Sequence, residues 1–473
     1  MFLLTTKMKT FLKKILLLNA IILIFSSCSK QFKDDNFTAY FGGEITNPTN
    51  SYVLFCKDSK VIDSILLNKD NTFFIKIDSL TPGLYSFKHE PEYQYVYFEK
   101  NDSLMISLDS KNFDESLVFS GRGEQKNNFL MDLYLKNQQD KSTLFSVLDL
   151  NVADFSRNIN TSYQLKEKFY NSRKETIKWS DDFDIYAKGM LQFYQYSKKE
   201  MYPMVHKMRT GENIKDKLPK NFYDFRQDID FNDNKFTDFS PFVKYLSAML
   251  NNIACDKEFQ NLSNIDKTLE INIKKLDIAD TLFDNAKIKN KILDNIAFNY
   301  LLEDQNIENN KKFLDRFYQL SDKSNKNDII KIGNSIQLLK PGNVLPKVDL
   351  VDLNNKKGTL DSFITKKTVL FFWTESLESH MIAAHKKIMI LQKNHPEYQF
   401  IAVNVNQNQQ QWTDFLANYK FKNILELRAV NFEDIRTKLV INKINRTLII
   451  NADKTINNAF DNIFAVEFES HLK

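Results

Sequence analysis

The residues of this chain whose types could do chemistry gather in one short stretch. Glu375, Glu378 and His380 stand close together, and His385 follows further along. Two histidines five positions apart on a helix do not share a face as the His-x-x-x-His pair of a metal site does, so a metal would need ligands from elsewhere. Ser379 beside His380 is typical of a nucleophile and its base, but a serine here is expected to cap the following helix. A solvated helix start is therefore the main interpretation, and no catalytic residue, metal ligand or cofactor is predicted.

This stretch lies between a predicted buried strand and a predicted helix. The strand is the apolar run Val369–Trp373, which has the length and composition of a strand covered on both faces. The helix is expected from Ser379 to Lys393, because apolar residues recur there at helical spacing, namely Met381, Ala384, Ile388 and Leu391. These two elements must position whatever the stretch does.

The strand and the stretch after it resemble the strand-to-active-site segment of thioredoxin-like proteins of the TlpA type. In that family the redox cysteines stand four and seven positions after the Trp that ends the strand, and Leu377 and His380 occupy those positions here. Neither side chain can form a thiolate, so neither can attack a disulfide. The family also carries a cis-proline just before a strand of the type Arg446–Ile450, and Asn445 stands in its place. A trans bond is expected there, because a cis bond before a non-proline residue costs about 2.5–4 kcal/mol.

The resemblance implies a thioredoxin-like α/β domain over residues 341–473, opened by the run Pro341–Pro346. Apolar runs bounded by turns predict strands at 348–353, 368–373, 399–404, 425–429, 447–450 and 455–458. Helices are expected at 379–393, 410–419 and 432–439, with a further helix at the C-terminus. Strands that alternate with helices imply a central sheet covered on both sides.

Residues 37–120 read as short strands separated by turn residues, which favours an antiparallel β-sandwich. This part resembles the N-terminal β-domain of many TlpA-like lipoproteins through Gly83–Tyr85, Asp102–Leu104 and Ser120–Glu124. Tyr93, Tyr95 and Tyr97 alternate along one strand. They could bind a ligand, although a strand with two covered faces explains them better.

Residues 121–340 are predicted to form a helical region, with apolar residues at helical spacing and breaks at Pro203, Pro219 and Pro241. It contains no catalytic motif, and His206 is interpreted as a structural or surface residue. The fold class predicted for the whole chain is α+β multidomain: an N-terminal antiparallel β-sandwich, a helical middle region and a C-terminal thioredoxin-like α/β domain.

The N-terminus predicts the location. Lysines precede an apolar run at residues 15–25 that is too short for a transmembrane helix, as expected of a signal peptide over residues 1–27. Ser26 and Ser27 before Cys28 resemble a lipobox, which implies cleavage before Cys28 and its acylation. Residues 28–36 would then be a tether, and the protein would sit in the cell envelope, lipid-anchored at the outer membrane and facing the periplasm or the surface.

Charge and cysteine content exclude some functions. The 65 Lys and Arg residues nearly balance the 60 Asp and Glu residues, for a net charge of +5, so nucleic-acid binding has no electrostatic support. Besides Cys28 only Cys56 and Cys255 are present. They could pair in an oxidising compartment, or each could behave as a small buried hydrophobic residue.

The favoured function is non-catalytic binding or scaffolding of a protein or peptide, together with membrane attachment through the lipid. The candidate binding residues surround the former redox positions, and they are Trp373, Glu375, Glu378, His380 and Arg446. A thiol-disulfide oxidoreductase is the enzyme alternative, which would need a catalytic cysteine that residues 341–473 lack. A nutrient-binding lipoprotein that uses the aromatic residues of the β-domain is the third alternative.

Overall fold

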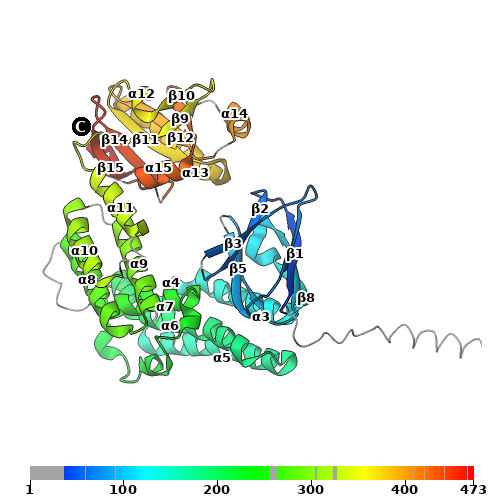
Figure 1. Ribbon diagram of the computed structural model, residues 1–473. Coiled ribbons are helices and arrows are strands. Elements are labelled where there is room, and N and C mark those ends of the chain that lie inside the picture. Colours follow the sequence, from blue (N-terminus) through cyan, green and yellow to red (C-terminus); the bar gives the residue numbers. More distant parts are fainter. Residues whose placement is uncertain are drawn as a thin grey trace, which may run out of the picture. The chain divides into compact units, whose positions relative to one another are not determined.

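The computed structural model describes residues 37–472, apart from residues 59, 91, 256–263, 304–305, 323–326, 407, 420, 442 and 466 (Figure 1). The predicted signal peptide (1–27), the tether (28–36) and Cys28 lie outside the described residues. Two compact units divide the chain: one is Met1–Val147 with Ser156–Gln192, and the other is Leu148–Phe155 with Phe193–Lys473. Within the described residues, no helix combines the length and the apolar character needed to cross a membrane.

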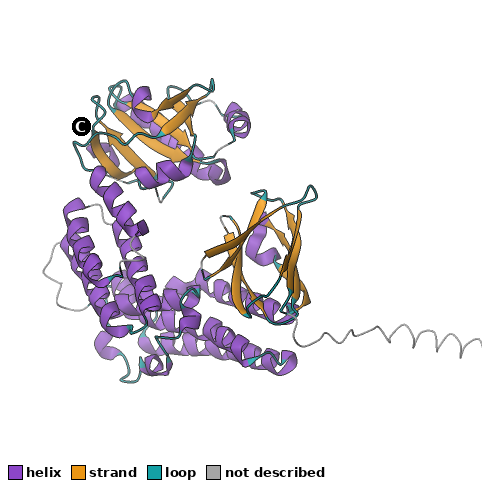
Figure 2. Ribbon diagram, viewed as in Figure 1, coloured by secondary structure: helices purple, strands orange, loops and turns teal. Residues whose placement is uncertain are grey.

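The first unit begins with two four-stranded sheets, which face each other across one core (Figure 2). Their orders are β4-β1-β7-β8 and β3-β2-β5-β6. The strands are β1 (Ala39–Thr46), β2 (Tyr52–Lys57), β3 (Lys60–Leu66), β4 (Thr72–Ile77), β5 (Gly83–His89), β6 (Glu92–Phe98), β7 (Ser103–Asp109) and β8 (Val118–Arg122). Short η1 (Ser110–Asn112) and α2 (Phe113–Ser116) join β7 to β8.

The prediction that this part is wholly antiparallel is wrong at one pair, because β1 and β7 run parallel. The strands between them in sequence provide the long crossover that a parallel pair requires.

Aromatic side chains fill the space between the two sheets. The Phe41 ring lies 5.4 Å from that of Phe55 and 5.9 Å from that of Phe98, measured between centroids. Tyr97 points the other way and is buried against Phe183 and Tyr186 of α6 (Asp181–Thr210), with ring centroids 5.1 and 5.8 Å away. A helix therefore covers one of the three tyrosines that were candidates for ligand binding.

Asp102 and the segment 120–124, which resembled a family motif, connect this sandwich to the helix that follows it. Lys126 of α3 (Glu124–Gln139) donates from Nζ to Asp102 Oδ2 at 2.7 Å and to Glu99 Oε2 at 3.0 Å. Gly123 has a positive φ of 94°, and a Cβ there would lie 2.7 Å from the Asp102 carboxylate. Burial raises the pKa of Asp102, and the nearby Lys126 opposes that rise. The motif is thus explained by packing.

Helices make up the middle of the chain, as predicted. After α3 come η2 (Asp140–Thr143), α4 (Leu144–Leu148), α5 (Val152–Ile177), α6, η3 (Lys215–Lys217), η4 (Asp224–Asp228), η5 (Asn234–Phe236), α7 (Ser240–Ala254), α8 (Asn264–Leu282), α9 (Ala286–Glu303), α10 (Ile307–Leu320) and α11 (Asn327–Leu338). Pro241 stands in the first turn of α7, where proline is tolerated. Pro203 lies inside α6 and does not end it, which corrects the prediction. His206 is buried, with Nδ1 2.8 Å from the carbonyl oxygen of Leu148.

The C-terminal part is a seven-stranded mixed sheet with the order β10-β9-β13-β12-β11-β14-β15. Its elements are β9 (Asp349–Asp352), β10 (Lys357–Thr359), α12 (Leu360–Phe363), β11 (Thr368–Trp373), η8 (Glu375–Leu377), α13 (Glu378–Asn394), β12 (Gln399–Asn404), α14 (Gln409–Ala417), β13 (Leu425–Ala429), α15 (Phe432–Lys438), β14 (Arg446–Ile450), β15 (Ile456–Asn462) and η9 (Phe468–His471). All six residues of β11 are buried, as expected of a central strand covered on both faces.

The C-terminal helix was predicted wrongly. β15 continues to Asn462 by pairing with β14, and among the described residues after it the regular structure is the 3₁₀ turn η9.

Candidate functional site

The candidate site lies at one edge of the C-terminal sheet. β11 and β12 are parallel and end there at Trp373 and Asn404, and the antiparallel β14 begins there at Arg446. The segment from Thr374 to His380 therefore emerges beside the start of β14. The carboxyl edge of parallel strands is where α/β sheets usually place their ligands.

The two residues at the former redox positions both reach the surface in part. Leu377 is 47% exposed. His380 is half-buried and packs against Phe464, with ring centroids 5.5 Å apart. Both of its ring nitrogens are buried and have no hydrogen-bond partner among the described residues. Burial lowers the pKa of His380, and the neighbouring His385 lowers it further, so the ring is neutral at pH 7.

Glu375 forms one wall of a shallow groove. Its Oε2 accepts a hydrogen bond from Asn406 Nδ2, whereas its Oε1 is buried without a partner among the described residues. Thr374 Oγ1 donates to Asn406 Oδ1 at 3.1 Å and so ties the ends of β11 and β12 together. The groove has a volume of about 550 Å³, and the remaining residues that line it come from α14 and its two ends: Asn408, Gln410, Gln411, Asp414, Phe415 and Asn418.

The first turn of α13 differs from the prediction. The helix begins at Glu378, with Leu377 at the N-cap and no side-chain cap, so Ser379 does not cap it. Glu378 Oε1 accepts a hydrogen bond from the Tyr419 hydroxyl. That bond to a carboxylate raises the pKa of Tyr419.

Trp373 and Arg446 belong to the interior. Trp373 is 0% exposed, so its side chain cannot contact a partner. The prediction that Trp373 is a binding residue is therefore wrong. Arg446 is only 5% exposed and lies over the Phe460 ring, 4.8 Å from the ring centroid. Burial lowers the pKa of Arg446 to about 10, and Asp461 acts against that shift. Both residues build the base of the site.

Asn445, at the former proline position, lies in the turn just before β14 and is half-buried. Its carbonyl oxygen accepts a hydrogen bond from Thr447 Oγ1 at 3.3 Å. The asparagine side chain makes no hydrogen bond within the described part of the chain.

A fully buried polar group beneath the site was not predicted. His385 of α13 is completely buried. Its Nδ1 lies 2.7 Å from the carbonyl oxygen of Met381, and its Nε2 lies 3.0 Å from Glu426 Oε1 of β13. Glu426 Oε2 accepts a hydrogen bond from Trp373 Nε1 at 3.2 Å. The sequence signal was the pair of charged residues inside an otherwise apolar strand, Leu425–Ala429.

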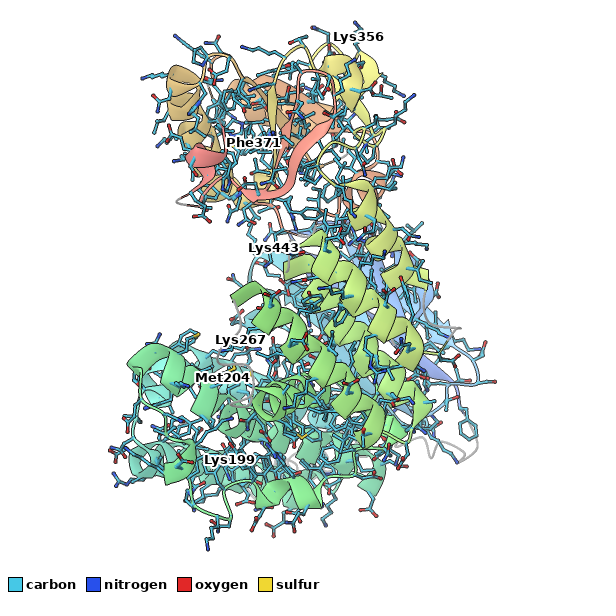
Figure 3. All side chains as sticks on the ribbon, turned by 90° about the vertical axis from the view of Figure 1, so that its left-hand side faces the viewer. Lys199, Met204, Lys267, Lys356, Phe371 and Lys443 are labelled. Atoms are coloured by element: carbon cyan, nitrogen blue, oxygen red, sulfur yellow. The ribbon has the colours of Figure 1, made fainter. Side chains whose placement is uncertain are left out.

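Aromatic rings enclose this histidine. Phe421 stacks on it, with centroids 4.0 Å apart and planes at 19°. Phe371 and Trp373 meet it edge-on at 5.1 and 5.7 Å, and Figure 3 marks Phe371 within the C-terminal domain. These rings exclude water from the contact between His385 and the Glu426 carboxylate.

The chemistry open to this site is limited. The sequence has no cysteine from residue 341 onward, so thiol exchange has no nucleophile there. Across the described residues, no group of three His, Cys, Asp or Glu side chains could hold a metal ion. Cys56 and Cys255 are both free thiols, so they do not form a disulfide with each other.

Comparisons with known proteins place part of the chain beside thioredoxin-like structures. A thioredoxin-like protein from Bacteroides caccae is similar over 54% of this chain and 90% of its own, at 16% identity and a TM-score of 0.35. A thiol:disulfide interchange protein from a Bacteroides species covers 25% of this chain and 80% of its own, at 16% identity and a TM-score of 0.23.

An exposed lipoprotein thioredoxin from Streptococcus pneumoniae is similar over 24% of this chain and 85% of its own, at 14% identity and a TM-score of 0.21. No model of a known protein family matches the sequence. No curated protein matches it either.

Proposed function

We propose that the C-terminal domain binds a protein or peptide partner without covalent chemistry, in a lipid-anchored protein of the cell envelope. The binding surface, called the docking surface below, consists of Glu375, Leu377, His380 and Phe464. The observation that carries the proposal is His380, a neutral imidazole with two buried and unpartnered nitrogens between partly exposed apolar side chains.

Burying an imidazole without hydrogen bonds costs free energy, of the order of 1–3 kcal/mol for an unsatisfied polar group. A partner that draws the His380 side chain toward the surface and supplies a donor or an acceptor to it would recover that cost. Leu377 and Phe464, 47% and 41% exposed, offer the apolar contact that exposed hydrophobic side chains at interaction sites provide. The groove beside Glu375 extends the same surface with carboxamide groups, which both donate and accept hydrogen bonds.

Removing the docking surface tests this function. The intact protein, isolated from its own membranes after cross-linking, should retain a partner that is lost in Leu377→Asp and in His380→Ala. The matched control is Leu353→Asp, because Leu353 is 50% exposed in the turn after β9 and lies outside the surface. The melting temperatures should stay unchanged. Equal loss in all three variants, or in none, would contradict the proposal.

A redox assay separates binding from the enzyme alternative. The purified protein should not reduce insulin disulfides above background, because the thiols expected at positions 377 and 380 are absent. Turnover above background that is lost in Cys56→Ser combined with Cys255→Ser would establish an oxidoreductase and overturn the proposal.

The anchor has a separate test. Mass spectrometry of the mature N-terminus should find an acylated Cys28. A Cys28→Ala chain that still fractionates with membranes would contradict lipid anchoring and would leave the docking surface unaffected.

A further inference from the structure

A half-enclosed cavity of about 360 Å³ lies in the helical part of the second unit. Three helices line it: α7, α8 and α9. Its volume is within the range of about 300–1,000 Å³ usual for small-molecule sites. This cavity is remote in sequence from the docking surface and does not depend on the function proposed for it.

The floor of the cavity is apolar and tightly packed. Leu250, Ile296 and Tyr300 form it, and all three are buried. Tyr300 is held in place by Phe313 of α10, with ring centroids 4.3 Å apart. Of the three, Ile296 and Tyr300 keep a small exposed part, 6% and 2%, that a flat apolar ligand face could contact.

The walls are made of carboxamides that the protein itself orients. Ser247 Oγ and Asn299 Nδ2 both donate to Asn295 Oδ1, at 3.1 and 3.2 Å. The Asn295 oxygen is thus occupied, and its Nδ2 remains a donor. The Asn251 side chain makes no hydrogen bond with any described residue, so it offers both a donor and an acceptor.

The charge of the lining restricts the ligand further. None of the residues that line the cavity is Asp or Glu, which disfavours a cationic ligand. Lys275 is the cation of the lining, and its Nζ already donates to Asn272 Oδ1 at 3.0 Å. The remaining residues of the lining are uncharged.

We propose that this cavity binds a neutral polyhydroxylated ring of about the size of a pyranose sugar. Each hydroxyl of such a ring both donates and accepts a hydrogen bond, which matches the donor and acceptor of Asn251 and the Nδ2 donor of Asn295. The carbon–hydrogen face of the ring matches the floor of Leu250, Ile296 and Tyr300. Mutual hydrogen bonds hold part of the wall in position before the ligand arrives, which reduces the entropy lost on binding.

Ligand-observed NMR on the whole protein tests the proposal, with methyl β-glucopyranoside, methyl β-galactopyranoside and glucuronate as probes. At least one neutral glycoside should show saturation transfer at millimolar concentration. Asn251→Ala should weaken its binding about tenfold or more, as expected when a site loses a hydrogen bond to a ligand hydroxyl. Asn171→Ala is the control, because Asn171 is an exposed asparagine of α5 outside the cavity, and it should leave binding unchanged.

Three outcomes would overturn the proposal. Absence of transfer from every probe would exclude a sugar-like ligand. Equal weakening by Asn251→Ala and Asn171→Ala would place the binding elsewhere. Preferential binding of glucuronate that disappears in Lys275→Gln would assign the cavity to an anion instead of a neutral ring.

Discussion

The β-sandwich and the C-terminal sheet domain each bury a histidine, His89 and His385, in opposite ways. Both rings place Nδ1 against a carbonyl oxygen, at 3.1 Å from Tyr52 O for His89 and at 2.7 Å from Met381 O for His385. Each Nδ1 must therefore carry a proton. The difference lies at the second nitrogen, which faces a donor in one case and an acceptor in the other.

In the β-sandwich, the second nitrogen of His89, Nε2, must carry no proton. His89 Nε2 accepts a hydrogen bond from the backbone N–H of Thr49 at 2.9 Å, so this ring is folded in its neutral form. Burial lowers the pKa of His89, which agrees with that assignment. The ring fastens the turn between β1 and β2 to the end of β5.

In the C-terminal domain, the second nitrogen needs a proton between itself and Glu426. Either His385 is an imidazolium that donates to a carboxylate, or Glu426 is a carboxylic acid that donates to a neutral ring. The pair therefore holds one proton more than a neutral histidine beside a carboxylate. The comparison shows that the hydrogen-bond partner of Nε2 decides whether a buried histidine excludes a second proton or retains it.

The largest expected effect comes from breaking the His385 pair. Glu426→Leu leaves His385 Nε2 and Trp373 Nε1 buried without partners, and loss of one member of a buried ion pair costs about 3–5 kcal/mol of unfolding free energy. Urea denaturation would measure it. Glu433→Leu serves as control, because Glu433 is an exposed residue of α15 and its removal should change little. A loss under about 1 kcal/mol at Glu426 would mean that the pair does not hold the domain together.

Replacing both His385 and Glu426 should recover much of the unfolding free energy lost in the single variant. The double variant His385→Phe with Glu426→Leu leaves no buried charge, and apolar replacement of a buried ion pair is often neutral or stabilising by about 1–4 kcal/mol. The coupling energy from a double-mutant cycle is the measurement. Additive losses from the two single variants would show that the two residues act independently.

A smaller loss of unfolding free energy is expected when acid protonates His89. Its folded pKa is lowered below the unfolded value of about 6.5, so the unfolded chain binds more protons in the window between the two values. The stabilisation is fully present above about pH 6.5 and declines as the pH falls through the folded pKa. Urea midpoints at pH 7.5 and pH 5 should drop less in His89→Gln than in the parent chain. Parallel pH profiles would refute this account.

The smallest change in unfolding free energy is expected from a substitution on the exposed side of α13, the helix that carries His385. Glu378→Gln should change the unfolding free energy by no more than about 0.5 kcal/mol, because Glu378 is exposed at the start of α13. The buried reference is Phe371→Ala, which should cost about 3–5 kcal/mol. Thermal melts of both variants would check the contrast. A destabilised Glu378→Gln would show that its bond to Tyr419 holds the helix start.

The sequence predicted the strands of the C-terminal sheet because they are apolar runs bounded by turns. β11, β12 and β13 were expected at 368–373, 399–404 and 425–429, and they occupy these ranges. β10 and α12 were missed, since three and four residues are too short to show a period.

The buried polar pair could not be predicted from sequence. His385 and Glu426 are 41 residues apart and meet only because the fold brings α13 against β13. Trp373 was included in the strand predicted to be buried and was still proposed as a binding residue, because the direction of a strand-end side chain depends on what covers the sheet. The half-burial of His380 depends on the loop after β15, through its contact with Phe464.

The contact of Gly123 with Asp102 has a consequence for where the chain can be altered. The β6–β7 turn and the start of α3 are joined by the Lys126 ion pairs, and the space above Gly123 is filled. Most connections between elements accept extra residues or a cut, because their backbone is exposed and unpaired. The junction between β8 and α3 should not: a one-residue insertion there would separate Lys126 from its carboxylates. Chain permutation, epitope tags and protease sites belong in other turns of this unit.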